Sequence, residues 1–84
     1  MVRSTPHRFS PIKLLLPGSG EILTIKSVRD ALKALVHDWP ETTGESYMLA
    51  LQTCIDAIAE RASSELAREA LIGAAAEAGI PVMS

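Results

Sequence analysis

The sequence is poor in aromatic residues and in cysteine. Phe9, Trp39 and Tyr47 are its only aromatic side chains, so a buried core must be built from Leu, Ile, Val and Ala. Its one cysteine, Cys54, cannot form an internal disulfide, which excludes a disulfide-stapled domain and favours a reducing compartment. The sequence also lacks a secretory signal and any apolar run long enough to span a bilayer. We therefore expect a cytoplasmic protein without a membrane partner.

Basic charge and catalytic groupings are also scarce. Eight Lys and Arg residues against ten Asp and Glu give a net charge of -2, and no basic stripe marks a nucleic-acid-binding surface. No His, Cys or carboxylate group has metal-ligand spacing, and His37 suits the end of a helix. A hairpin turn explains Gly18-Ser19-Gly20 better than a phosphate-binding loop does. We expect a non-enzymatic protein without a cofactor, and leave a small-molecule ligand open.

A β-hairpin is predicted near the N-terminus. Two segments rich in Leu, Ile and Thr, 12–16 and 21–26, flank the turn sequence Pro17-Gly18-Ser19-Gly20. Because strand side chains alternate, one face collects five apolar residues: Ile12, Leu14, Leu16, Leu23 and Ile25. The other face carries Lys13, Leu15, Ile22 and Thr24. An isolated hairpin is marginally stable in water, so we expect the first face to pack on helices.

The first predicted helix begins at a capping signal and ends at a proline. Ser27 with Asp30 resembles a capping box, and Pro40 stops the helix just after Trp39. The apolar positions form one stripe at helical spacing: Val28, Ala31, Leu32, Leu35, Val36 and Trp39. We expect this stripe to be buried, with Trp39 as the lid of the core.

The second predicted helix runs from about Gly44 to Arg61. Thr42 and Glu45 form a second capping-box signal. The predicted buried stripe is Tyr47, Ala50, Leu51, Cys54, Ile55 and Ile58. On this stripe Cys54 is interpreted as a small packed side chain rather than a nucleophile.

The third predicted helix is rich in alanine. Ser63 and Ser64 offer its N-cap, and Gly79 is placed as a left-handed C-cap. Its apolar residues are Leu66, Ala67, Ala70, Leu71, Ala74, Ala75 and Ala78. Arg68 is interpreted as part of an internal pair, with Asp56 or Glu60, and the alternative is a charge presented to a partner. The pattern explains neither Gly73 nor whether residues 80–83 add a short third strand.

Together these elements predict an α+β fold. An N-terminal β-hairpin is followed by three helices (ββααα), in a single domain that spans residues 12–84. Residues 1–11 contain two prolines and no apolar period, so they are predicted to form a flexible lead-in.

Residues in a fixed order along the chain carry a family resemblance. They are Trp39-Pro40, Gly44, Tyr47, Ala50, Cys54, Ala57, Ala67-Arg68, Ala74-Ala75 and Ala78-Gly79-Ile80, behind a short hairpin. With this order the chain resembles domain-of-unknown-function family 982, small proteins common in rhizobia and their relatives, over nearly all of its length after Phe9. The resemblance implies a hairpin followed by three helices and a bacterial cytoplasmic setting. It implies no activity.

The favoured function is a small protein-interaction module, with another protein or a second copy as partner. A hairpin has free edges, and its second face carries Leu15 and Ile22, so a homodimer is a candidate arrangement. Lysines on an edge strand oppose such pairing. The candidate interaction surface comprises Leu15, Ile22, Trp39 as an alternative anchor, and Arg68.

The alternative function is a nucleic-acid-linked regulatory protein that uses the two C-terminal helices. A short turn near residues 62–64 joins these helices, as in a helix-turn-helix. Glu65, Glu69 and Glu77 would oppose phosphates, and only Arg68 would favour them. We therefore rank this function second.

Overall fold

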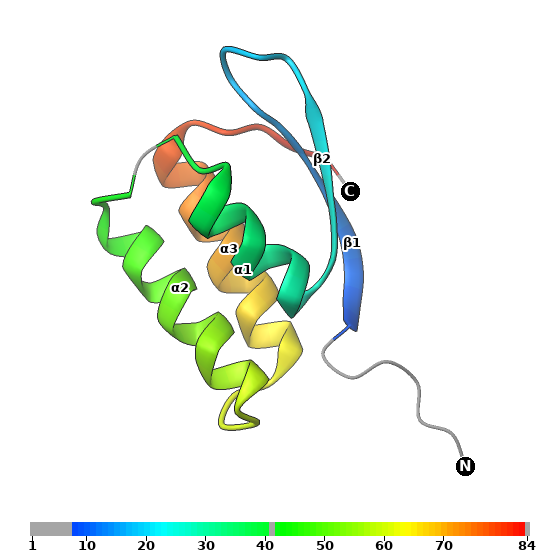
Figure 1. The fold of residues 1–84 in the computed structure, drawn as a ribbon, viewed down its shortest axis with the longest axis vertical. Coiled ribbons are helices and arrows are strands. Elements are labelled where there is room, and N and C mark those ends of the chain that lie inside the picture. Colours follow the sequence, from blue (N-terminus) through cyan, green and yellow to red (C-terminus); the bar gives the residue numbers. More distant parts are fainter. Residues whose placement is uncertain (1–7, 41, 84) are drawn as a thin grey trace.

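A computed structural model describes residues 8–40 and 42–83 of the chain. Its elements are β1 (Arg8–Leu15), β2 (Ile22–Ser27), α1 (Val28–His37), α2 (Glu45–Ile58), α3 (Ser64–Ala78) and β3 (Val82–Met83). The predicted α+β fold, a hairpin followed by three helices, is confirmed, and β3 supplies the third strand that the sequence pattern left open. Figure 1 shows the strands on one side of the molecule and the three helices on the other.

The hairpin has the predicted register. Ile12 lies opposite Ile25 and Leu14 opposite Leu23, in antiparallel pairing. The predicted lead-in is wrong for residues 8–11, because β1 begins at Arg8 rather than Ile12. A register irregularity between Arg8 and Ile12 lets pairing continue past Pro11, which has no N–H to donate. The rest of the lead-in, residues 1–7, lies outside the described residues.

The strand order β2-β1-β3 places β1 in the centre of the sheet. Gly79 adopts the predicted left-handed C-cap (φ 74°), and Ile80 folds back so that its N–H donates to the Ala75 carbonyl at 2.8 Å. Pro81 then accepts a hydrogen bond from the Leu15 N–H at 3.1 Å, and β3 pairs antiparallel with β1. The end of α3 therefore turns the chain onto the outer side of β1 and leaves β2 at the edge.

The predicted apolar face of the hairpin packs on the helices. Ile12, Leu14, Leu16 and Ile25 are buried and Leu23 is half-buried. Helix α1 contacts β2, α3 contacts β1 and β3, and α2 packs against the other two helices. Burying these four hairpin side chains stabilises the fold by about 1.5–3 kcal/mol each. A hairpin without the helices would lack this stabilisation.

The buried stripes of the helices are narrower than predicted. Val36 and Ile55 were expected inside, yet their side chains are 58% and 43% exposed. Leu66, one of the apolar residues that marked the third helix, is 54% exposed. The close contact between α2 and α3 uses small residues instead, such as Ala57. Thr53 is also buried there, because its hydroxyl donates to the Leu49 carbonyl at 2.7 Å within the same helix.

The start of α2 is capped from a distant part of the chain. The predicted Thr42 cap is wrong: Gly44 is the N-cap, and its helix runs only to Ile58 rather than to Arg61. The carboxylate of Glu77, near the end of α3, accepts hydrogen bonds from the N–H groups of Ser46 (3.1 Å) and Tyr47 (3.2 Å). A Cβ at Gly44 would collide with this carboxylate. Glycine at this position therefore leaves room for an acidic cap at the positive end of α2.

Candidate functional site

Leu15 and Ile22 form a cross-strand pair on the face of the sheet that the helices leave uncovered. They lie directly opposite each other in the β1–β2 register, as predicted. Ile22 is 56% exposed and Leu15 is half-buried. This pair is the part of the expected interaction surface that the structure brings together.

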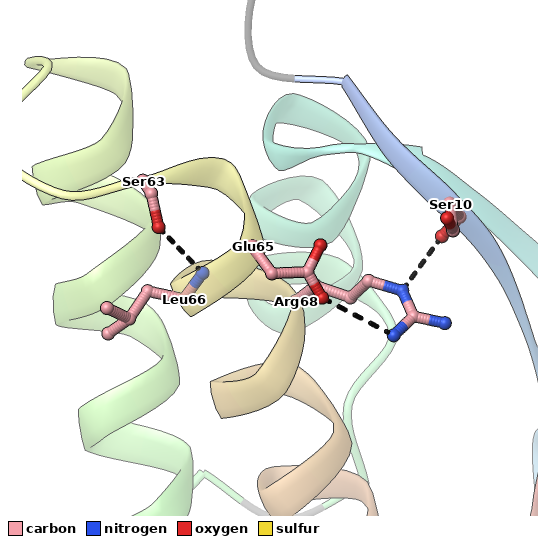
Figure 2. Close-up of polar contacts among 5 residues, drawn as sticks. All are labelled: Ser10, Ser63, Glu65, Leu66 and Arg68. Atoms are coloured by element: carbon pink, nitrogen blue, oxygen red, sulfur yellow. Dashed lines mark hydrogen bonds and ion pairs between the residues drawn. The ribbon is translucent and has the colours of Figure 1, made fainter.

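The outer edge of β1 is closed. Near the hairpin turn it is covered by β3, with Lys13 opposite Met83. Further along, Pro11 carries no N–H, and the Arg68 Nε donates to the Ser10 carbonyl at 3.0 Å, as Figure 2 shows. These contacts leave little of β1 for another strand to pair with, so β1 is not the edge at which a partner adds.

Arg68 therefore has a structural role that differs from the prediction. The expected pair with Asp56 or Glu60 is wrong: its Nη1 lies 3.8 Å from Glu65 in the same helix, and Asp56 pairs with Arg61 at 3.6 Å. The side chain of Arg68 reaches across to β1 because α3 packs against that strand (Figure 2). Arg68 thus belongs to the closed edge and is not near Leu15 and Ile22.

The outer edge of β2 is open. The Leu16 N–H donates to the Glu21 carbonyl at 2.9 Å, which fixes the alternation of hydrogen bonds along the hairpin. By this alternation Leu23 and Ile25 direct their backbone groups to β1, whereas Ile22, Thr24 and Lys26 direct theirs outward. We refer to β2 with these outward groups as the free edge. No other strand of the described residues pairs with it.

One donor on the free edge is already satisfied. The Lys26 N–H donates to the Asp30 Oδ2 at 3.1 Å. The Asp30 N–H in turn donates to the Ser27 Oγ at 3.2 Å, which is the predicted N-cap of α1. The outward N–H groups that remain for a partner belong to Ile22 and Thr24. Thr24 and Asp30 were not predicted as site residues. Hairpin alternation could have indicated Thr24. The predicted capping box could have indicated Asp30, because its carboxylate reaches back to a backbone N–H only four residues earlier.

A groove runs beside the free edge, between β2 and α1. One hollow of about 350 Å³ is lined by residues that include Thr24, Asp30, Lys33 and Asp38. A second hollow of about 380 Å³, at the hairpin turn, is lined by residues that include Glu21 and Asp38. Because Asp38 lines both, the two adjoin, and we call them together the α1–β2 groove. Both are open to solvent rather than enclosed, which suits side chains of a bound segment.

Trp39 is not part of the surface. Its side chain is only 7% exposed, so its interpretation as a lid of the core is confirmed and its alternative use as an interaction anchor is wrong. The indole Nε1 is buried without a hydrogen-bond partner among the described residues. Its position follows from the end of α1 at His37, where the chain turns inward before Pro40.

Cys54 lies in the core, as predicted. Its side chain is fully buried, and this burial raises the pKa of the thiol from 9.0 to about 11. At neutral pH the thiol is therefore protonated and has little nucleophilic character. Its place between packed helices gives it no access to a substrate.

The described part of the chain offers no metal-binding cluster of three or more His, Cys, Asp or Glu residues. None of its helices has both the length and the apolar character needed to cross a membrane.

The fold and the site define a small α+β domain whose sheet ends in the six-residue strand β2 on one side and in the two-residue strand β3 on the other. Residues 10–82 match the family described as "Protein of unknown function (DUF982)", and the chain belongs to this family. The resemblance stated from the sequence is thereby confirmed. No curated protein and no solved structure matches the chain.

Proposed function

We propose that this protein is a non-enzymatic protein-interaction module that binds by adding a partner strand to the free edge of β2. The observation that carries this proposal is the pair of outward N–H groups at Ile22 and Thr24. On the opposite side, β1 is covered by β3 and Arg68, and β3 offers an edge of only two residues. An added strand would satisfy these groups, and such main-chain bonds are a recurrent source of affinity in peptide recognition.

The exposed pair Leu15 and Ile22 supports the same edge. Side chains of an added strand would lie next to Ile22 on the uncovered face and remove it from water. Burying an exposed isoleucine makes the free energy of binding more favourable. Only two residues, Ile22 and Thr24, offer free backbone N–H groups to the added strand, so the affinity stays modest. We therefore propose a reversible contact rather than a permanent one.

A second copy of the chain can supply the partner strand under two-fold symmetry. In antiparallel pairing with Leu23 on the two-fold axis, Ile22 of each copy would lie opposite Thr24 of the other and exchange backbone hydrogen bonds with it. The contact between Lys26 and Asp30 would stay intact. The homodimer that the sequence suggested would thus form through β2.

Sedimentation velocity over micromolar concentrations tests this pairing. We expect a concentration-dependent dimer in the wild type and a monomer in Thr24→Pro, because proline removes an outward N–H while its neighbours keep their bonds to β1. Leu15→Lys should weaken the dimer less, since Leu15 lies one strand away from the contact. A dimer that persists in Thr24→Pro would contradict the β2 edge. A wild type that is monomeric throughout would exclude the second copy and restrict the function to strands of other proteins.

A further inference from the structure

We infer that the strand which the free edge binds most tightly carries basic side chains on the side that faces α1, and that it belongs to another protein, with a second copy as the weaker occupant. This inference rests on the proposed strand addition. In an added strand, alternate side chains point to opposite faces of the sheet. Those on the helix side would enter the α1–β2 groove, so the groove decides which sequences fit.

The groove is acidic. Its titratable lining comprises three carboxylates, one ammonium group and one imidazole, those of Asp30, Asp38, Glu21, Lys33 and His37. One carboxylate oxygen of Asp30 already accepts a hydrogen bond from the Lys26 N–H. Within residues 8–40 and 42–83, no salt bridge involves Asp38 or Glu21. A Lys or Arg side chain beside Leu23 or Ile25 would point to the helix side of an added strand and meet these carboxylates. Among the described residues they form no salt bridge with Lys33, so they are free to pair with the added cation, and an acidic side chain would be repelled.

A second copy matches this groove less well than a basic strand does. On its helix-facing side, β2 and its turn present Glu21, Leu23 and Ile25. Paired at the edge, a second copy would bring the carboxylate of Glu21 toward a groove that is already rich in carboxylates. Its own Lys26 lies at an alternate position and points to the uncovered face. Charge complementarity thus favours a basic extended segment from a different chain over self-pairing.

A peptide titration followed by NMR tests the inference on the full-length chain. The probe is a capped seven-residue peptide of alternating lysine and valine, and its counterpart has glutamate in place of lysine. Binding should shift the NMR signals of the Ile22 and Thr24 amides. At low salt we expect the lysine peptide to bind about ten-fold more tightly than the glutamate peptide, the preference that two partly exposed charge pairs would give. The difference should shrink at high salt. Thr24→Pro should remove binding of both peptides.

Matched charge variants identify the groove as the cause. The double variant Glu21→Gln/Asp38→Asn should lose most of the preference for lysine. The control Glu60→Gln/Glu69→Gln removes the same charge from exposed positions outside the groove and should keep the preference. A preference that falls equally in both variants would reflect net charge alone and would overturn the inference.

The outcomes separate this inference from the proposed function. Equal binding of both peptides at Ile22 and Thr24 would overturn the basic selection and leave strand addition standing. The same holds if neither peptide binds but the chain forms a dimer that Thr24→Pro abolishes. Binding of the lysine peptide that Thr24→Pro does not affect would overturn the inference, because the site would lie elsewhere. If neither peptide binds and the chain is monomeric, both proposals fail.

Discussion

Leu35→Ala is expected to lower the free energy of unfolding by about 2–5 kcal/mol, the range for truncating a large buried aliphatic side chain. Leu35 is fully buried in α1. Its carbonyl also accepts a hydrogen bond from the Tyr47 hydroxyl at 2.9 Å, which ties α1 to α2. For a chain of this length the loss is a large part of a total stability of about 4–13 kcal/mol. Urea unfolding followed by circular dichroism measures it.

Val36→Ala is the matched control. Val36 follows Leu35 in α1, and the apolar pattern of the sequence placed both on the buried stripe, but in the structure Val36 is 58% exposed. We expect a change within about 0.5 kcal/mol. Equal losses for the two variants would show that α1 is rotated relative to the described packing.

The wild type is expected to lose about 2 kcal/mol of stability between pH 9 and pH 11 through Cys54 alone. Burial raises the pKa of this thiol to about 11 in the folded chain, while the unfolded chain ionises near its ordinary pKa of 9.0. Above pH 9 the folded state therefore binds more protons than the unfolded state, and the free energy of unfolding falls as the pH rises. Two pKa units correspond to about 3 kcal/mol in all, and about 2 kcal/mol of this is lost by pH 11, where half of the folded thiol is ionised.

Cys54→Ala isolates this contribution from other groups that titrate in alkali. The difference in stability between wild type and Cys54→Ala should shrink by about 2 kcal/mol from pH 8 to pH 11, measured by urea unfolding at each pH. At neutral pH Cys54→Ser should be less stable than Cys54→Ala, because it buries a hydroxyl. A pH-independent difference, or the reverse order of the two variants, would indicate an exposed thiol.

Local sequence signals predicted the elements whose causes are local. The hairpin register followed from the turn at residues 17–20, and the Ser27 and Ser63 caps and the left-handed Gly79 were all confirmed. Each of these depends on side chains within a few residues of the backbone groups that they satisfy. Agreement among such signals is what made the α+β fold predictable.

Features that depend on distant contacts were not predictable in this way. Glu77 caps α2 from the other end of the adjacent helix, and Arg68 bonds to Ser10 on β1 rather than to a neighbour on a helix. Ile55 fits the apolar spacing of α2 but is 43% exposed, because spacing alone does not set how wide a face of the helix its neighbours cover. None of these contacts leaves a periodic trace in the sequence.

Local signals predicted part of the candidate site but not the sheet edge at which it lies. Leu15 and Ile22 were identified from strand alternation alone, and they lie together. Which edge is open could not be predicted, because β3 reaches β1 only after the whole helical layer has formed. The central feature of the molecule is therefore that β1 is interior to the sheet and β2 is its longer open edge.

Native-state amide hydrogen exchange, measured by NMR on a dilute solution, tests that claim most directly. We predict slow exchange at Leu23 and Ile25, which bond to β1, and at Leu15, whose N–H donates to Pro81. Ile22 and Thr24 should exchange fast, since their N–H groups face outward on the free edge. Slow exchange at Ile22 and Thr24, or fast exchange at Leu15, would contradict the account.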